Sequence, residues 1–312
     1  MTTKTKTHHY LSVTDMTADE TWQLLRTAAE FKRAPIYRPR HGPLAQQTLA
    51  MIFEKPSLRT RVSFETGMTQ LGGHAIYLGP ADIKLGVRET VEDVALTLSR
   101  MADMIMARVF KHETVVELAK YSTVPVINAL SDLEHPCQAL GDMQTIVERE
   151  GKLAGVKLAF VGDGNNVANS LLLAGGLMGM HVTVISPPGF EPAGEVLERA
   201  SRLAKDSGGS AKATTDVEAI KGMDVVYTDV WASMGQESEA EARKEPFRPY
   251  QLNETLMKRA RPNATVLHCL PAHYGEEIEY NTSRRKGSAI FDQAENRLHA
   301  EKALMVRLAE KS

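Results

Sequence analysis

The sequence predicts an α/β protein with two similar domains, each a parallel sheet with helices on both faces, and with the active site in the cleft between them. Short apolar runs of strand length alternate with amphipathic segments of helical length, which is typical of parallel strands joined by helices. The stretch 151–155 interrupts this alternation, which then starts again. A chain of 312 residues is long enough to form two hydrophobic cores.

The elements follow from the periodicity of apolar residues and from capping and breaking residues. In the first half we expect strands at residues 48–53, 75–78, 103–107 and 124–128, and helices at 14–34, 57–71, 90–101, 113–120 and 135–150. In the second half we expect strands at 156–161, 181–185, 211–214, 224–228 and 265–268, and helices at 166–178, 194–205 and 295–309.

The domain boundary is expected near the end of the helix 135–150. We assign residues 1–148 to a first domain, with the last helix, 295–312, packing back on it, and residues 149–294 to a second. The polar segment 232–250 is too long for a simple connection, which makes it a candidate lid or binding loop.

Composition narrows the class of function. A formal net charge of -2 gives no sign of a nucleic-acid or membrane partner. No apolar run approaches the ~18–20 residues of a membrane span, and the N-terminus does not resemble a signal peptide. The two cysteines, Cys137 and Cys269, are far apart and have no metal-binding spacing. We therefore expect a cytoplasmic protein without a metal.

Polar side chains follow the ends of six predicted strands. Parallel sheets bind ligands at the carboxyl ends of their strands, so this placement is a strong indication of a binding site. The residues placed in this way are Ser57, Arg108, His135, Asn165 with Asn166, Asp229, and His268 with Cys269.

The segment after the first strand has the features of an anion site. Ser57 would stand at the N-terminus of a helix whose first turn carries Arg59, Thr60 and Arg61. The unpaired backbone N–H groups, the helix dipole and the guanidinium groups all favour an oxyanion. The alternative is an ordinary N-cap serine followed by solvated arginines.

Two further motifs allow more than one interpretation. Residues 162–167 follow a strand and open a helix, as in dinucleotide-binding proteins, but the third glycine and the later acidic residue are missing. Asn165 and Asn166 could instead hold a carboxylate, or simply form a turn. Further on, His135 and Gln138 share a helix face and could contact a carbonyl and an amide. Cys137 could pair with His135, although a buried, inert thiol is the simpler interpretation.

Together these motifs resemble the carbamoyltransferases, the family of aspartate and ornithine carbamoyltransferase. The run 57–61 resembles the family's phosphate-binding signature, with Leu58 where Thr is usual, and 135–138 matches His-Pro-x-Gln. The segment 229–235, Asp-x-x-x-Ser-Met-Gly, and the run 268–271, His-Cys-Leu-Pro, resemble the ornithine enzymes in particular. Lys84 departs from them, because it stands where those enzymes usually have Gln.

The resemblance implies transfer of a carbamoyl group from carbamoyl phosphate to the δ-amine of L-ornithine, giving L-citrulline and phosphate, as in arginine biosynthesis. It implies catalytic roles for Arg59, Arg108, His135 and Cys269. The carbamoyl-phosphate residues would be Ser57, Leu58, Arg59, Thr60, Lys84, Arg108, His135, Gln138, Cys269, Leu270 and Arg297, and the ornithine residues Asn166, Asp229, Ser233 and Met234.

The resemblance also implies direct attack by the amine through a tetrahedral intermediate, without a cofactor. The expected partners are the two substrates, and the expected assembly is a homotrimer, or a multiple of it, with the loop of Lys84 entering a neighbour's site. Three alternatives remain. One is carbamoyl transfer to a related amine such as putrescine, another is a nucleotide-dependent oxidoreductase, and the third is a binding protein without activity.

Overall fold

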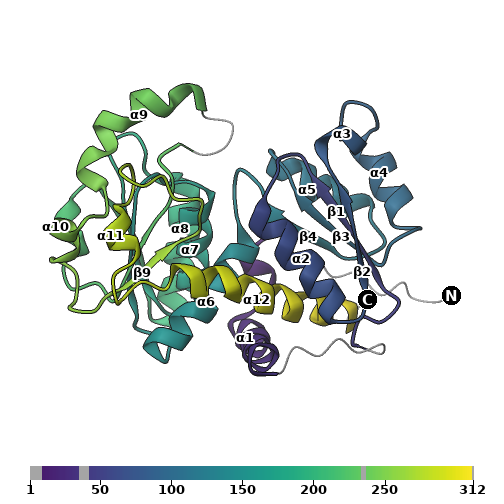
Figure 1. Ribbon diagram of the computed structural model, residues 1–312, viewed down its shortest axis with the longest axis horizontal. Coiled ribbons are helices and arrows are strands. Elements are labelled where there is room, and N and C mark those ends of the chain that lie inside the picture. Colours follow the sequence, from purple (N-terminus) through teal and green to yellow (C-terminus); the bar gives the residue numbers. More distant parts are fainter. Residues whose placement is uncertain (1–8, 35–41, 233–236, 311–312) are drawn as a thin grey trace. The chain divides into compact units, whose positions relative to one another are not determined.

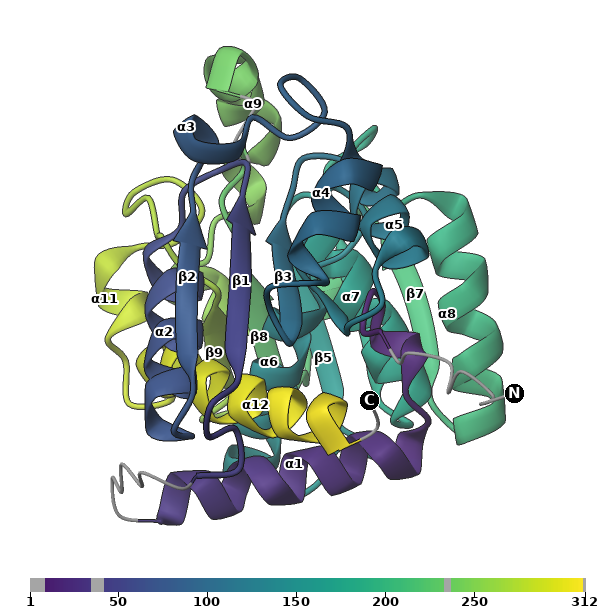
Figure 2. The same ribbon diagram turned by 90° about the vertical axis from the view of Figure 1, so that its right-hand side faces the viewer.

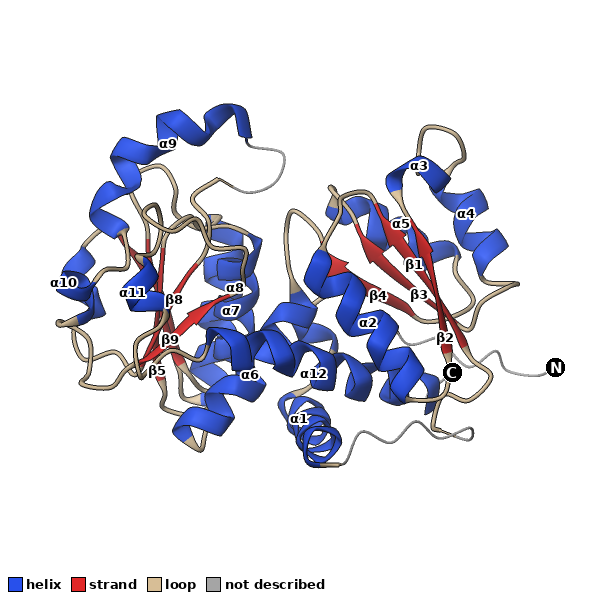
Figure 3. Cartoon of the chain, in the orientation of Figure 1, coloured by secondary structure: helices blue, strands red, loops and turns tan. Residues whose placement is uncertain are grey.

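A computed structural model describes residues 9–34, 42–232 and 237–310 and divides the chain into two compact units. Unit 1 comprises residues 1–141 and 295–312, and unit 2 comprises residues 142–294. Two helices carry the chain from one unit to the other, α6 (Pro136–Glu150) and α12 (Ile290–Glu310). Each unit contains one parallel sheet with helices around it (Figures 1 and 3).

Unit 1 is built on four parallel strands in the order β2-β1-β3-β4. Their bounds are β1 (Thr48–Phe53), β2 (His74–Leu78), β3 (Met104–Arg108) and β4 (Val126–Leu130). Figure 2 shows β2, β1 and β3 side by side and pointing the same way. The strands β1, β3 and β4 are almost wholly buried, which explains why their sequences are continuous apolar runs rather than alternating ones.

Helices connect these strands and cover them. They are α1 (Ala18–Arg33), α2 (Leu58–Gln70), the short α3 (Pro80–Ile83), α4 (Val91–Leu98) and α5 (His112–Tyr121), together with the unit 1 parts of α6 and α12. The last helix packs on α2 at Gly67, where an added Cβ would lie 3.1 Å from the Met305 side chain. It is also tied to α1, because Lys32 donates a hydrogen bond to Asn296.

Unit 2 is built on five parallel strands in the order β7-β6-β5-β8-β9. The strands are β5 (Lys157–Val161), β6 (His181–Ile185), β7 (Ser210–Thr214), β8 (Val225–Thr228) and β9 (Thr265–His268). The helices are α7 (Asn166–Leu177), α8 (Gly194–Ser207), α9 (Ala240–Phe247), α10 (Glu254–Met257) and α11 (Tyr280–Ser283). The predicted fold, two domains with a parallel sheet each, is thus confirmed.

Two segments differ in secondary structure from what the sequence suggested. The described part of 232–250 is largely helical, because α9 and two 3-10 turns, Glu237–Glu239 and Arg248–Tyr250, occupy most of it. The final helix begins at Ile290 rather than near residue 295, since the apolar run before it is its first turn. In the part of the chain that the structure describes, no helix has the length and apolar character needed to cross a membrane.

Candidate active site

The residues of the predicted anion site lie in unit 1, where the end of β1 is followed by the N-terminus of α2. Ser57 is the N-cap of α2, and its Oγ accepts a hydrogen bond from the Thr60 amide at 3.3 Å and donates to Thr60 Oγ1 at 3.1 Å. Ser57 therefore caps the helix, as the alternative interpretation predicted. It does not compete with an anion site, because capping leaves other first-turn N–H groups pointing out of the helix end.

Only part of the signature run faces this site. Thr60 is fully buried, whereas the Leu58 side chain is 74% exposed. Arg61 points elsewhere, because its Nε lies 2.9 Å from Glu65 and its guanidinium stacks on Tyr77 at 4.0 Å. The expectation that both arginines form the anion site is thus corrected: Arg61 is used within its own helix and against β2.

His135 is a buried histidine inside a cluster of positive charge. Its pKa is lowered well below the usual value, first by burial and then by the nearby cations. The cations that act on it are Arg297, Arg108, Arg59 and Lys55. The ring is therefore neutral at neutral pH, and it can donate one hydrogen bond without adding a further charge. We call these five residues, with Ser57, Thr60 and Gln138, the cationic group.

The elements explain why the cationic group assembles. Arg108 is the last residue of β3, as predicted, and His135 directly precedes α6, which brings Gln138 into its first turn. Arg108, His135 and Gln138 are each no more than 5% exposed. A cation that is buried in this way requires a negatively charged partner.

Arg297 is held in the cationic group by residues of two helices. Its Nη2 donates to Thr60 Oγ1 at 3.0 Å and to Glu301 Oε1 at 2.7 Å. It approaches α6 closely at Gly141, where an added Cβ would lie 3.0 Å from Arg297 Cγ and 3.2 Å from its backbone nitrogen. Thus a glycine in α6 makes room for the arginine.

Sequence reasoning missed Lys55 and Glu301. Lys55 precedes Ser57 by two residues, and this position in the loop before the helix could have indicated that it belongs to the site. Glu301 is one helical turn after Arg297, a spacing that puts the two side chains on the same face. Burial raises the pKa of Glu301, and the Arg297 guanidinium opposes that rise.

Of the two interpretations of Cys137, a partner of His135 or a buried and inert thiol, the structure supports the second. It is fully buried, and its Sγ donates to the Asn128 carbonyl at 3.4 Å. Burial raises its pKa well above the usual value, which disfavours the reactive thiolate. It points into the sheet, whereas His135 belongs to the cationic group.

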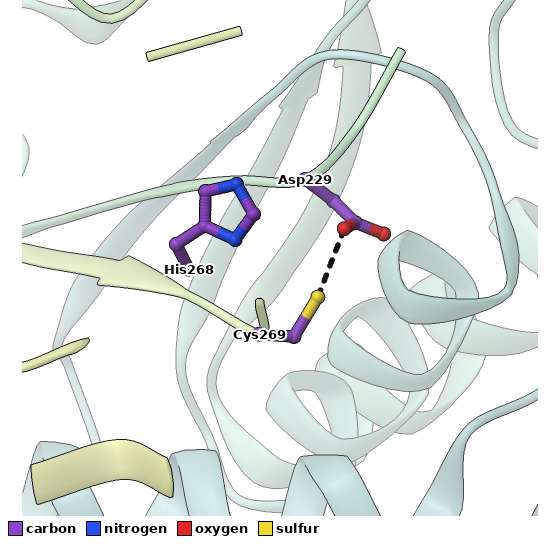
Figure 4. A group of neighbouring side chains, drawn as sticks. All are labelled: Asp229, His268 and Cys269. Atoms are coloured by element: carbon purple, nitrogen blue, oxygen red, sulfur yellow. Dashed lines mark hydrogen bonds between the residues drawn. The ribbon is translucent and has the colours of Figure 1, made fainter. Parts of the chain in front are cut away.

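A second group of polar residues lies in unit 2, around Asp229. The carboxylate follows β8 and is 7% exposed. Oδ1 accepts from the Val230 amide at 2.8 Å and from Cys269 Sγ at 2.9 Å, and Oδ2 accepts from Asn165 Nδ2 at 2.9 Å. Figure 4 shows Cys269 pointing at this carboxylate. We call these residues, with Asn166 and Leu270, the Asp229 group.

The two asparagines have different roles. Asn165 is the N-cap of α7, where its Oδ1 accepts from the amides of Val167 and Ala168, while its Nδ2 donates to Asp229 Oδ2. Its side chain is therefore used inside the protein, contrary to the expectation that it helps to hold a carboxylate. Asn166 is the first residue of α7 and is partly exposed.

The glycine pattern before Asn165 has a structural cause. A Cβ on Gly164 would lie 2.3 Å from the backbone nitrogen of Pro192 and 2.8 Å from the Phe190 carbonyl oxygen. The segment after β6 thus packs directly on this turn, and Gly164 donates to Phe190 at 2.8 Å. In a dinucleotide site such a glycine lets the pyrophosphate approach. Here the chain itself fills that space, which argues against the oxidoreductase alternative.

Asp229, His268 and Cys269 have side-chain atoms within 4.8 Å of one another, as a metal site would require. Both ring nitrogens of His268 are engaged, however. Nε2 lies 2.9 Å from Glu277 Oε1, and Nδ1 lies 2.8 Å from the Leu270 amide. A metal could bind the ring only by displacing one of these hydrogen bonds, so the residues do not fit a metal site.

Three predicted residues remain. Ser233 and Met234 lie outside the described residues. Lys84 is exposed at the C-terminal end of α3 and has a left-handed backbone, with φ of 42°.

The comparisons with known proteins agree with this geometry. Residues 8–148 match the carbamoyl-P binding domain of the aspartate/ornithine carbamoyltransferases, and residues 154–308 match their Asp/Orn binding domain. The chain is 53% identical to the anabolic ornithine carbamoyltransferase of Pyrococcus furiosus, covering 95% of this chain and 94% of that one.

Two other relatives extend this result. The ornithine carbamoyltransferase of Anoxybacillus flavithermus is 52% identical over 98% of both chains. The solved structure of the Pyrococcus furiosus enzyme superposes with a TM-score of 0.91 at 52% identity, covering 96% of each chain. The chain therefore belongs to the aspartate/ornithine carbamoyltransferase family.

Proposed function

We propose that the chain transfers the carbamoyl group of carbamoyl phosphate to the δ-amine of L-ornithine, giving L-citrulline and phosphate. The relatives that are about 50% identical to this chain, and that it matches over nearly their whole length, are named ornithine carbamoyltransferase. The observation that carries the proposal is the cationic group, in which Arg297 donates to Thr60 in the first turn of α2 and four cations lower the pKa of the buried His135. These cations favour the binding of a phosphate dianion at the N-terminus of α2.

The cationic group binds carbamoyl phosphate in this proposal. Ser57, Arg59, Thr60 and the α2 N-terminus take the phosphate, and the exposed Leu58 contributes its backbone only. Arg297 joins them through the Thr60 hydroxyl that it already contacts. Charge-assisted hydrogen bonds from guanidinium groups stabilise phosphate as it leaves.

Arg108 and His135 polarise the carbamoyl carbonyl, and Gln138 with the backbone of Leu270 holds the carbamoyl nitrogen. The carbonyl oxygen becomes an oxyanion in the tetrahedral intermediate, and preorganised donors stabilise it more strongly than they stabilise the ground state. His135 suits this role because a neutral imidazole can donate a hydrogen bond without losing its proton.

The Asp229 group holds ornithine. Asp229 takes the α-ammonium, since a carboxylate has acceptor sites beyond the three hydrogen bonds that it receives. Asn166 takes the α-carboxylate, and Ser233 and Met234 complete the contacts. Cys269 Sγ donates to Asp229 Oδ1, and this geometry favours a positioning role near the amine over a proton-accepting one.

The attacking δ-amine must be neutral, although its pKa in solution is close to the ~10.4 of a lysine. A cationic site favours the neutral amine and releases a proton. We predict that kcat/KM for ornithine rises between about pH 6 and 8, because the neutral amine becomes more abundant. A pH series of initial rates measures this, and a flat profile would contradict it.

The central test offers four acceptors in parallel with carbamoyl phosphate. These are ornithine, putrescine, aspartate and N-acetylornithine, and both phosphate and the carbamoylated product are measured. Ornithine alone should give a product, citrulline. A preference for putrescine would favour the alternative substrate, and phosphate release without any carbamoylated product would contradict carbamoyl transfer altogether.

The assembly is proposed to be a homotrimer, or a multiple of it, in which Lys84 reaches a neighbouring subunit's carbamoyl phosphate. The exposed position of Lys84 supports this, because the side chain can reach another chain. Mixing inactive Arg59→Ala and Lys84→Ala subunits should restore activity if sites are shared. Each mixture component alone is the control, and a mixture without activity would contradict shared sites.

A cytoplasmic location is part of the same proposal, supported by the two free cysteines.

A further inference from the structure

The loop after β9 has a conformation that needs support from elsewhere. Leu270 has a φ of 59°, in the left-handed region that residues other than glycine rarely adopt. Such a backbone persists only when its surroundings fix it, and it is common at functional sites. In the proposed function this residue's backbone holds the carbamoyl nitrogen, so what fixes its peptide bears on catalysis.

The Leu270 amide is fixed by a side chain two residues earlier. It donates to His268 Nδ1 at 2.8 Å. His268 ends β9 and is 1% exposed, and its own amide donates to Gln293 Oε1 at 2.9 Å. Ring and backbone of His268 are thus both fixed, and the ring is the acceptor that Leu270 depends on.

The second ring nitrogen of His268 determines that Nδ1 can accept. Nε2 lies 2.9 Å from Glu277 Oε1, and both side chains are completely buried. Since Nδ1 accepts from an amide, the ring proton must be on Nε2, where it is donated to Glu277. A carboxylate at this point therefore selects the tautomer that presents a lone pair to Leu270.

Glu277 is itself anchored in unit 2. Its Oε1 accepts from the His273 amide at 2.6 Å, and its carbonyl accepts from the Leu252 amide at 2.8 Å. Gln251 Nε2 donates to the carbonyls of Gly275 and Glu276, both at 2.8 Å. The turn that carries Glu277 is thus held against the segment 251–252.

We propose that Glu277 and His268 are positioning residues for the carbamoyl-transfer reaction, and that they act by fixing the Leu270 peptide through the hydrogen-bond series Glu277–His268–Leu270. This inference rests on the proposed function, because it assigns a purpose to Leu270. Neither residue touches substrate. Their effect is to hold the left-handed backbone of Leu270 in the conformation that binds the carbamoyl group.

The test separates the two ring nitrogens of His268. In His268→Asn the amide oxygen replaces Nδ1 and can still accept from Leu270, whereas contact with Glu277 is lost. In His268→Gln the amide nitrogen replaces Nε2 and can still donate to Glu277, whereas the acceptor for Leu270 is lost. Citrulline formation and thermal unfolding are measured for both.

We expect activity and stability to rank in opposite order. His268→Asn should keep kcat within about fivefold of the wild type and lose thermal stability, because Glu277 loses a donor. His268→Gln should be the more stable variant, yet lose about 10- to 100-fold in kcat, as expected when the residue that orients a substrate-binding group is lost. A merely structural role for His268 would make the less stable variant also the less active one.

Two controls complete the experiment. His181→Gln alters a partly buried histidine of the same unit, which contacts Ser210 at 3.0 Å, and should leave kcat unchanged. Glu277→Gln keeps an oxygen acceptor for His268, and should therefore be more active than Glu277→Ala. If the His268 variants fail to fold, the two Glu277 variants test the positioning role instead.

The outcomes are distinguishable. If the wild type makes no citrulline, the proposed function fails. If the wild type makes citrulline but His268→Gln matches or exceeds His268→Asn in kcat, the positioning role is overturned. Equal kcat for Glu277→Gln and Glu277→Ala would also overturn it.

Discussion

The cationic group and the Asp229 group differ in the charge that they present to a ligand. In the first, four cations act on one histidine, and burial with their charge keeps that histidine neutral. In the second, the single carboxylate already receives hydrogen bonds from Val230, Asn165 and Cys269. The first group thus presents several cations to a dianion, and the second presents one hydrogen-bonded carboxylate that suits the ammonium group of an amino acid.

Different substitutions should therefore damage the two groups. A site that depends on several cations is sensitive to the loss of any one of them. A site that depends on a hydrogen-bonded frame is sensitive to the geometry of its backbone as well. The following four predictions test this difference.

The largest effect is expected at Arg59. Arg59→Ala should lower kcat/KM by about 10²- to 10³-fold, because a charged donor to the leaving phosphate is lost. Arg61→Ala is the matched control, since Arg61 pairs with Glu65 and Tyr77 instead. Its kinetics should stay within about threefold of the wild type. Steady-state rates measure both, and equal losses would contradict the assignment of the two arginines.

A smaller effect, confined to one substrate, is expected at Asp229. Asp229→Asn should raise the KM for ornithine by about 30- to 100-fold, because the α-ammonium loses its charged partner. Binding of carbamoyl phosphate, measured by titration calorimetry, should be unaffected. Weakened carbamoyl phosphate binding would mean that the carboxylate supports both substrates.

The backbone of the Asp229 group is tested at Gly164. Gly164→Ala should lower the free energy of unfolding by about 1–3 kcal/mol, because its Cβ would collide with the backbone of residues 190–192. Gly194→Ala is the control, as a Cβ there meets nothing within 4 Å. Urea unfolding measures both. Equal stability of the two variants would show that the turn next to Asn165 adapts easily.

The smallest effect is a pH dependence of stability due to His135. Its pKa is lowered in the folded protein from the usual 6.5, so below about pH 6.5 the unfolded chain binds a proton that the folded protein excludes. Stability should therefore fall as pH decreases, by up to about 1.4 kcal/mol per pH unit for this group. The difference between wild type and His135→Gln, measured by urea unfolding from pH 7 to 5.5, isolates it. Parallel curves would contradict the lowered pKa.

Much of the fold and of the candidate site could be predicted because the informative signals are local. Buried parallel strands are continuous apolar runs, and polar residues follow their carboxyl ends because parallel sheets bind ligands there. Arg108 at the end of β3 and Ser57 at the start of α2 were placed correctly in this way. The family and the activity class followed from short motifs, which the comparisons confirm.

The misplaced residues depend on contacts between distant segments. Arg61 has the same residue type as Arg59, and only the packing of β2 against α2 shows that it stacks on Tyr77. Asn165 and Asn166 are adjacent, yet capping of α7 and the approach of Asp229 give them different partners. Such differences cannot be obtained from residue type and spacing.

The sequence by itself determined the two-sheet architecture, the family and most of the residues that bear the proposed chemistry. Those depend on periodicity and on motifs within a few residues, which are properties of the chain alone. Only the tertiary structure decided which distant side chains are engaged with one another: Arg297 with Thr60, and Glu277 with His268. Hydrogen bonds and pKa shifts depend on burial and on neighbours in space, and folding creates both.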